Sequence, residues 1–217
     1  MLFRDRVDAG RKLAANLDAY ADRQDVIVLA LPRGGVPVAW EVAQALHAPL
    51  DIFLVRKLGV PGHSELAMGA IASGGTHVVN QAVVEQLNIT HEQLSEVAAE
   101  ELIELARREK AYRDNRPAPQ LRDQTVILVD DGLATGSTML AAVKAVQEQH
   151  PARVVVAVPV AAVETCEKFQ QQVDEVICVQ TPQPFYAVGS WYDNFSQTSD
   201  DEVRNLLATA NEQRTLR

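Results

Sequence analysis

Three short runs of the sequence are apolar almost throughout. They are VIVLAL, TVILVD and ARVVVAVPV, at 26–31, 125–130 and 152–160. Strands of this kind are covered on both faces, as in parallel sheets, whereas a strand with one wet face alternates apolar and polar residues. Segments with apolar residues at helical spacing separate the runs. Because strands that alternate with helices are joined by crossovers, the pattern predicts an α/β fold with a doubly wound, mostly parallel sheet flanked by helices.

The remaining elements follow from the same two periods. Further strands are expected at 50–56, 66–73, 76–80 and 174–179, and helices at 36–47, 90–112, 137–150 and 163–171. The glycine pair at 74–75 predicts a turn between two of these strands, and Thr90 is a good N-cap. We expect one domain of 217 residues with its core at about 25–180. An N-terminal helix at 3–20 and the segment 181–217 fall outside this core.

The composition argues against several classes of protein. The formal net charge is −9, which disfavours a dedicated nucleic-acid binder because phosphate contacts need basic surface. No window is apolar for long enough to span a membrane, and the N-terminus lacks the apolar core of a signal peptide. These features predict a cytoplasmic protein. Cys166 and Cys178 form no CxxC pair, and we expect both to be buried packing residues.

The stretch VILVDDGLATGST, at 126–138, ends an apolar strand in two aspartates and continues as a small, hydroxyl-rich loop. Adjacent carboxylates at a buried strand end are costly unless they meet hydroxyl donors or a cation such as Mg2+. The loop enters a helix, whose first N–H groups converge on a point that suits a phosphate. A capped strand-to-helix turn explains one acid or one hydroxyl, not all of them. The stretch predicts recognition of a diol beside a phosphate, the two ends of a ribose 5-phosphate.

This stretch resembles the fingerprint of the type I phosphoribosyltransferases. The resemblance implies transfer of a 5-phosphoribosyl group from phosphoribosyl pyrophosphate (PRPP) to a nitrogenous, nucleobase-like acceptor, with Mg2+ as cofactor and release of pyrophosphate. It makes Asp130 and Asp131 catalytic residues and metal ligands. The substrate contacts it implies in the loop come from Leu133, Ala134, Thr135, Gly136, Ser137 and Thr138.

A second loop, after the first strand, fits the same family. Arg33, Gly34 and Gly35 stand between that strand and the next helix. Glycines let a backbone approach an anion closely, and arginine adds positive charge. The loop therefore resembles the family's pyrophosphate-binding loop, although an ordinary βα turn would have the same residues.

Basic residues follow the second predicted strand. Arg56 and Lys57 stand at its end, before a stretch at 59–64 that is typical of a mobile loop. The resemblance makes both residues catalytic, because leaving pyrophosphate develops charge that cations stabilise. Glu65 is a candidate partner for either cation, and His63 is more typical of loop surface than of a catalytic base. The alternative for the basic pair is a solvated strand end.

The segment 181–217 concentrates aromatic residues in a chain that is 5% aromatic. By the resemblance, this segment forms a small hood, with the N-terminal helix as a further candidate for it. Phe185, Tyr186 and Trp191 would then stack on the acceptor base. The alternative is that these rings only pin a terminal flap to the core. Many family members pair, so a homodimer is a further expectation.

Two other functions would use the same pocket. One is a regulator that binds PRPP without turnover, and the other is a hydrolase or phosphorylase that splits an existing nucleotide. The formal net charge of −9 argues against a regulator that also contacts nucleic acid. The expected partners are therefore small molecules, PRPP and an acceptor, with no nucleic acid and no membrane.

Overall fold

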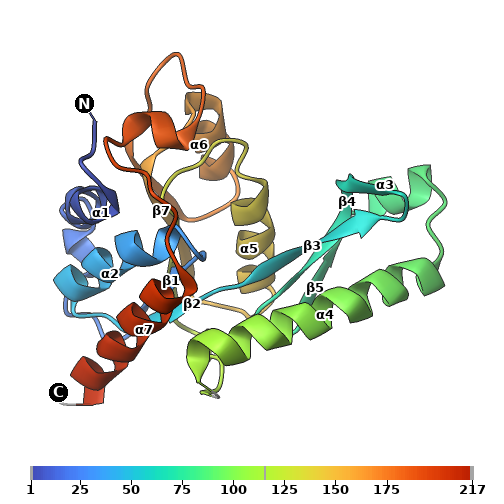
Figure 1. Cartoon of the computed structure of the whole chain (residues 1–217), viewed down its shortest axis with the longest axis horizontal. Coiled ribbons are helices and arrows are strands. Elements are labelled where there is room, and N and C mark those ends of the chain that lie inside the picture. Colours follow the sequence, from blue (N-terminus) through green and yellow to red (C-terminus); the bar gives the residue numbers. More distant parts are fainter. Residues whose placement is uncertain (1, 115, 216–217) are drawn as a thin grey trace.

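Five parallel strands form the central sheet, in the order β2-β1-β6-β7-β8 (Figure 1). The computed structural model describes residues 2–114 and 116–215, without the side chains of 64, 65 and 213–215. The strands are β1 (Val26–Ala30), β2 (Leu50–Ile52), β6 (Thr125–Val129), β7 (Arg153–Val160) and β8 (Glu175–Gln180). Every residue of β1 and β6 is buried. The predicted parallel sheet, with its centre apolar on both faces, is confirmed.

Helices cover both faces of this sheet, because alternate residues of each strand enter two different cores. Val28 and Ile127 belong to one cluster, while Leu29 and Leu128 belong to the other. The first cluster is completed by α1 (Arg6–Ala14), α2 (Gly35–Leu46) and α7 (Asp200–Thr215). The second is completed by α5 (Ser137–Gln147) and α6 (Val163–Gln170). The predicted doubly wound arrangement is confirmed.

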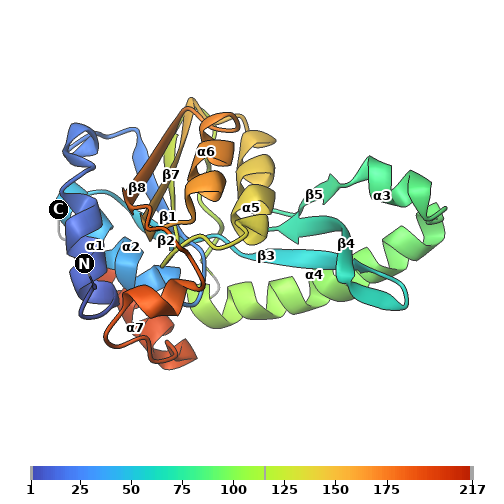
Figure 2. The same cartoon turned by 90° about the horizontal axis from the view of Figure 1, so that it is seen from above.

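Residues 55–113 leave the parallel sheet and form an arm that projects to one side (Figure 2). The arm holds a three-stranded antiparallel sheet and two helices: β3 (Val55–Val60), β4 (His63–Ala72), β5 (Thr76–Val79), α3 (Gln81–Gln86) and α4 (His91–Arg113). The predicted turn at 74–75 joins β4 to β5, with both glycines at positive φ. The N-cap of α4 is Thr90, in a capping box with Gln93.

Two predicted boundaries in this region are wrong. The run 50–56 is not one strand but the end of β2 and the start of β3, which lie in different sheets. The chain changes sheet at Phe53 and Leu54: the first donates to Ala30 O at 2.9 Å, and the second to Ser73 Oγ at 2.9 Å. Phe53 and Leu54 are both apolar and buried, so no polar residue marks the point where the chain passes from one sheet to the other.

The second wrong boundary is the loop expected at 59–64. The structure places Gly59 in β3 and His63 in β4, so the connection is a tight turn at Pro61 and Gly62. Gly62 adopts φ +78°, which favours glycine. Glycines and proline are typical of an open loop, but here only the two central residues turn the chain.

The cysteines are joined by a disulfide between Cys166 of α6 and Cys178 of β8. Burial was expected for both, and Cys166 is buried. A sequence separation of 12 and the absence of a CxxC spacing did not indicate a bond. Packing of α6 on β8 brings the two Cα atoms to 6.8 Å, which is a tertiary effect.

The two terminal segments join above the carboxyl ends of the strands. Phe3 forms a parallel bridge with Tyr192, and the backbone N–H of Phe3 donates to Trp191 O at 2.9 Å. A small cluster around Phe3 and Val160 then holds the C-terminal segment, including the 3-10 turn η2 (Val188–Trp191). A second 3-10 turn, η1 (Asp18–Tyr20), follows α1. Within the described residues, no helix has the length and apolar character needed to cross a membrane.

Candidate functional site

Two loops meet at the carboxyl ends of neighbouring strands. One follows β1 at 31–34, and the other follows β6 at 130–136. From β1 the chain runs to β2 on one side of the sheet, and it later returns through β6 on the other side of β1. This reversal of strand order brings the two loops together beyond the strand ends, and open α/β sheets bind ligands in the crevice at such a point.

The glycine pair of the first loop packs directly on the aspartate pair of the second. A Cβ atom on Gly34 would overlap Oδ2 of Asp131. A Cβ atom on Gly35 would lie 2.8 Å from Val129 O and 2.9 Å from the Cα atom of Asp130. Real Cβ atoms do not approach so closely, so both positions need glycine. The two motifs, far apart along the chain, thus form one site.

Both terminal segments hold Asp131 in place. Arg6 of α1 donates from Nε to Oδ2 of Asp131 at 2.9 Å, and its Nη2 lies 2.8 Å from the same oxygen. The hydroxyl of Tyr192 donates to Asp131 O at 2.6 Å. The guanidinium of Arg6 also lies 4.0 Å from the ring centroid of Phe195 and donates to Ser196 O. Asp131 is therefore fixed by residues from both ends of the chain.

The two carboxyl groups resist ionisation together. Burial raises the pKa of Asp130 well above its usual range, and the charge of Asp131 raises it further. Burial also raises the pKa of Asp131, although the guanidinium of Arg6 opposes this shift. A backbone N–H bond from Asp131 to Oδ1 of Asp130, 2.8 Å long, satisfies one oxygen. The site therefore favours ligands that donate hydrogen bonds or carry positive charge.

The second half of the loop opens the N-terminus of α5. Gly136 is the N-cap, with φ +69°, and no side chain caps this end among the described residues. The hydroxyls of Thr135 and Ser137 lie 3.1 Å apart at the exposed surface. Free N–H groups and the positive helix end leave this point suited to an anion.

Residues of α6 support this loop from below. Thr165 donates from its hydroxyl to Ala134 O at 2.6 Å. A Cβ atom on Gly136 would lie 2.6 Å from Cε2 of Phe169, so the loop packs closely on that ring. Leu133 is buried and bridges to Ala161, whereas Thr138 is exposed in the first turn of α5. Buried Leu133 thus anchors the loop, while the hydroxyl-bearing residues at 135, 137 and 138 are exposed to solvent.

The basic residues of the arm belong to a different sheet from the aspartates. Arg56 is in β3 and donates from Nε to Glu101 of α4 at 2.6 Å. Lys57 is exposed in the same strand. The aspartates, in contrast, follow β6 of the central sheet. The side chain of Glu65 lies outside the described residues.

The aromatic residues of the C-terminal segment differ in exposure. Tyr186 is 83% exposed, whereas Phe185 and Trp191 pack against the cluster around Phe3. The indole N–H of Trp191 is buried and has no partner among the described residues. Phe185 and Trp191 therefore attach the C-terminal segment to the rest of the protein, as the alternative expectation proposed. Stacking of the three rings on an acceptor base stays a prediction.

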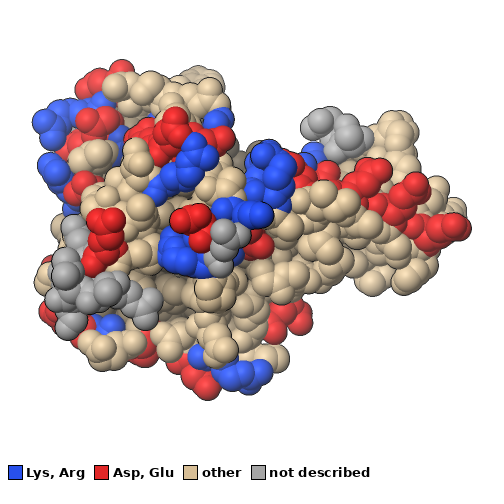
Figure 3. All heavy atoms as spheres, turned by 60° about the horizontal axis from the view of Figure 1, so that its bottom comes forward, with Lys and Arg blue, Asp and Glu red and all other residues tan. Residues whose placement is uncertain are grey.

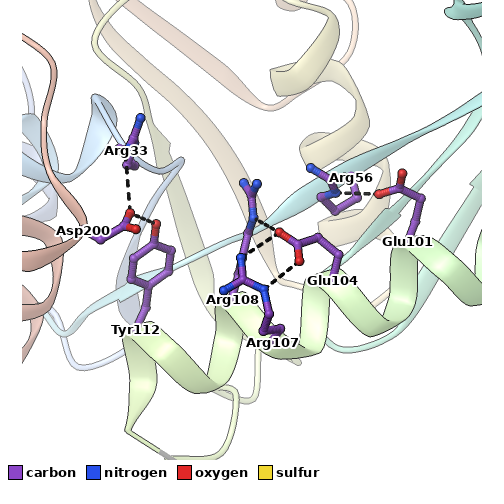
Figure 4. A network of polar contacts seen from close by, with 8 residues as sticks. All are labelled: Arg33, Arg56, Glu101, Glu104, Arg107, Arg108, Tyr112 and Asp200. Atoms are coloured by element: carbon purple, nitrogen blue, oxygen red, sulfur yellow. Dashed lines mark hydrogen bonds and ion pairs between the residues drawn. The ribbon is translucent and has the colours of Figure 1, made fainter.

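The side chain of Arg33 pairs with the start of α7. Its Nη1 lies 3.6 Å from Oδ1 of Asp200, at the start of α7 (Figure 4). Asp200 also accepts a 2.6 Å hydrogen bond from the hydroxyl of Tyr112 in α4. In this structure, the backbone of the loop faces the aspartates while its one charged side chain faces α4 and α7.

Sequence reasoning missed two charged residues that the structure brings to these loops. Arg6 lies 125 positions from Asp131, and Asp200 lies 167 positions from Arg33. Neither belongs to a local motif. The sequence around a charged residue near a chain terminus does not indicate which residue it will contact. Arg6 and Asp200 reach the two loops only because α1 and α7 pack against α2.

Comparison with known proteins places these features in a family. The phosphoribosyl transferase domain family matches residues 3–192. Two proteins of Mycobacterium tuberculosis, from strains CDC 1551 and H37Rv, each provisionally named a phosphoribosyl transferase, are 47% identical over 209 residues. The match covers 96% of this chain and 47% of theirs, so the chain spans about half the length of these curated relatives.

A solved structure, of the protein TT1426 from Thermus thermophilus, superimposes with a TM-score of 0.86 at 42% sequence identity. The match covers 96% of this chain and 99% of that one. The family match takes in both loops of the crevice, Arg6 and Tyr192, and the likeness to the Thermus structure extends along nearly the whole chain. The chain therefore belongs to the phosphoribosyl transferase domain family.

Proposed function

We propose that this protein transfers the 5-phosphoribosyl group of PRPP to a nitrogenous acceptor and releases pyrophosphate. One observation carries the proposal: Asp130 and Asp131 lie beside the glycine pair of the first loop, and a short loop at 132–136 joins them to the N-terminus of α5, which has no side-chain cap among the described residues. A pair of carboxylates accepts hydrogen bonds from a diol, and an open helix N-terminus binds a phosphate. These are the two ends of a ribose 5-phosphate.

Each part of the site has a role in this reaction. Asp130 and Asp131 accept hydrogen bonds from the ribose hydroxyls and offset the positive charge that builds on the ring as the bond to pyrophosphate breaks. The loop at 134–138 donates to the 5-phosphate. The backbone of the loop at 33–35, together with the basic side chains of Arg56 and Lys57, balances the charge of the leaving group.

The aspartates fit Mg2+ only together with a substrate. No group of three or more His, Cys, Asp or Glu side chains converges in the part of the chain that is described. Two carboxylates are present, and one oxygen of Asp131 is held by Arg6. Mg2+ is commonly bound by one or two carboxylates plus substrate phosphates and water. Asp130 and Asp131 would hold an ion delivered with PRPP, and that ion would supply charge neutralisation of pyrophosphate.

The protonation of the aspartates also follows from the geometry. In the free protein, burial and mutual repulsion raise the pKa of Asp130 and disfavour a doubly charged pair. A cation or a set of hydroxyl donors at this position favours the charged form. Substrate binding therefore gives the two carboxylates the donors or the cation that they lack in the free protein. The negative charge that is unfavourable in the free site thereby favours binding of the substrate.

The first experiment is isothermal titration with PRPP and Mg2+. We expect wild-type protein to bind PRPP, and an Asp130→Asn/Asp131→Asn variant to bind it at least tenfold more weakly. Thermal unfolding of both proteins shows whether the variant keeps its fold. Absence of binding to the wild type, or equal binding by the folded variant, would contradict the proposal.

Turnover separates the enzyme from its two alternatives. Incubation with PRPP, Mg2+ and a panel of purine, pyrimidine and amine acceptors is followed by mass spectrometry. A transferase releases pyrophosphate and forms a ribosylated acceptor. A nucleotide hydrolase or phosphorylase instead releases ribose 5-phosphate or ribose 1,5-bisphosphate from a nucleotide, and a regulator binds PRPP without any product.

A further inference from the structure

A second polar cavity lies between α4, α7 and the loop after β1. Its volume is about 200 Å³, and the residues that line it are Arg33, Arg107, Arg108, Ala111, Tyr112 and Asp200. Figure 4 shows Arg33 next to Asp200 and Tyr112 near one end of α4, and Arg107 and Arg108 around Glu104 farther along the same helix. Figure 3 shows Lys and Arg side chains gathered on the face that carries α4 and α7, beside the arm.

The charges around the cavity are unbalanced. Two of its three arginines share a single carboxylate, since Glu104 accepts from Nε of Arg107 at 2.7 Å and from Nε of Arg108 at 2.7 Å. The third, Arg33, has only the 3.6 Å ion pair with Asp200 among the described contacts. Three guanidiniums therefore face two carboxylates, which leaves one positive charge in excess. Each guanidinium has five N–H donors, and the contacts within the described residues use a minority of them.

Asp200 occupies the position that an anionic ligand group would take. Its carboxylate accepts from the Tyr112 hydroxyl at 2.6 Å and pairs with Arg33. Burial, with the nearby carboxylate, raises the pKa of Tyr112 to about 12, so this phenol stays a donor at neutral pH. The Asp200 side chain is 57% exposed and stands at the first residue of α7, where it can turn into solvent.

The cavity is separate from the crevice of the aspartates. Its lining contains neither Asp130 nor Asp131, and no residue of the loop at 134–138. The two sites adjoin at the loop after β1, whose Gly34 packs on Asp131 while Arg33 lines the cavity. An anion in the cavity would contact side chains that the ribose 5-phosphate does not need.

We propose that this cavity binds a second small anion, a phosphate- or carboxylate-bearing molecule distinct from PRPP, through Arg33, Arg107, Arg108 and the Tyr112 hydroxyl. Arginine suits both groups because its planar donors match their oxygens in pairs. The incoming anion replaces the carboxylate of Asp200. Because Arg33 adjoins the glycine pair at the aspartates, occupancy of the cavity acts on the position of that loop.

The test is titration with inorganic phosphate, followed by NMR of the arginine Nε–Hε groups. The signals of Arg107 and Arg108 are assigned by their loss in the single Arg→Gln variants. We expect phosphate to shift both signals in wild-type protein. We expect Arg107→Gln/Arg108→Gln to weaken phosphate binding in the cavity at least tenfold. Calorimetry should then detect only the other phosphate site, at the N-terminus of α5. We expect Asp200→Asn to strengthen phosphate binding in the cavity several-fold.

Suitable controls are available on the surface. Arg107 and Arg108 are 67% and 42% exposed, and glutamine is a good helix former, so the double variant should fold. Arg4→Gln/Arg122→Gln removes the same charge from exposed side chains outside the cavity, and should leave both phosphate sites intact. Unfolding curves of all variants are compared first. Equal phosphate binding by the cavity and control variants would overturn the proposal.

Saturation with PRPP distinguishes a separate ligand from the pyrophosphate of PRPP itself. If the cavity takes a second molecule, phosphate still shifts the arginine signals in protein saturated with PRPP and Mg2+. Loss of that response would overturn the proposal and assign the cavity to the leaving group. If PRPP does not bind at all, the proposed transferase function fails, while the phosphate titration of the cavity variants still decides this inference.

Discussion

Arg6 donates to Asp131 across 125 residues of sequence, through an Nε to Oδ2 hydrogen bond of 2.9 Å. Both side chains are largely buried, with exposed fractions of 11% and 15%. The contact orients one member of the aspartate pair and lowers the cost of its charge, since Arg6 opposes the effect of burial on the pKa of Asp131. A residue near the N-terminus is thereby part of a site built at the end of β6.

Replacement of this arginine should affect stability and binding together. Arg6→Gln leaves the carboxylate of Asp131 without its charged donor, so we expect a loss of about 2 kcal/mol in the free energy of unfolding. The pKa of Asp131 should rise further, and PRPP affinity should fall about tenfold. Urea unfolding and calorimetry at pH 7 measure both effects. Arg4→Gln, at a 73% exposed side chain, is the control, and an equal effect there would exclude a specific role for Arg6.

Neutralising Asp130 should stabilise the protein while it abolishes binding. The pKa of Asp130 is raised above 3.8 on folding, so its contribution to stability is fully present below about pH 4 and is lost as pH rises through the folded pKa. Each pKa unit corresponds to about 1.4 kcal/mol. Asp130→Asn should therefore raise Tm at pH 7 by a few degrees, about 2–4 °C per kcal/mol, and change it little at pH 4.

The matching measurement is a set of thermal unfolding curves between pH 4 and 8. An Asp130→Asn variant with a lower Tm than wild type at pH 7 would show that hydrogen bonding to this carboxylate outweighs its desolvation. PRPP titration of the same samples should show binding lost. The combination of higher stability and lost binding is the result expected of a residue kept for recognition.

The contact between the two loops predicts a strong effect of one methyl group. Gly34→Ala places a Cβ atom on Oδ2 of Asp131, so either the loop or the carboxylate must move. We expect PRPP binding to fall at least a hundredfold. Gly75→Ala is the matched control, because no atom lies within 4 Å and only its φ of +76° is unfavourable, at a cost of about 1 kcal/mol. Comparable PRPP affinity in the two variants would argue against close packing of the loops.

The hydroxyls before α5 should control affinity for the phosphate end of the substrate. Thr135→Val and Ser137→Ala each remove one donor from the exposed loop. A hydrogen bond to a charged group is worth about 1.5–3 kcal/mol, so each change should weaken binding of ribose 5-phosphate about tenfold or more. Calorimetry with ribose 5-phosphate measures this. Thr209→Ala, at an exposed position of α7, should be neutral, and loss of affinity there would point to a non-specific cause.

Much of the central sheet could be predicted because its signals are local. Runs such as 26–31 and 152–160 are apolar on both faces, which only a covered parallel strand explains. The helix that begins after Thr90 was predictable from its N-cap, since the capping contact spans three residues. The stretch at 126–138 carried the phosphate and diol signals in consecutive residues. Short-range physics was sufficient for the strands and the cap, and the ligand interpretation of 126–138 stays a prediction.

The arm was not predictable in the same way. Residues 50–56 read as one strand because both β2 and β3 bury apolar side chains, although they pair with different partners. Strand pairing depends on which segments meet in space, and the residues at the break, Phe53 and Leu54, are themselves apolar and buried. The disulfide of Cys166 and Cys178 depends likewise on the packing of α6 against β8.

The sequence alone determined the buried strand at 125–129 and the order of acids, glycine and hydroxyls after it, and from these adjacent residues it predicted a ribose 5-phosphate recognition motif. Only the tertiary structure decided what surrounds that motif. The pairing of Arg6 with Asp131, and of Arg33 with Asp200, joins side chains more than a hundred residues apart. Such contacts arise from the order of strands and the packing of helices from both ends of the chain, which no local pattern encodes.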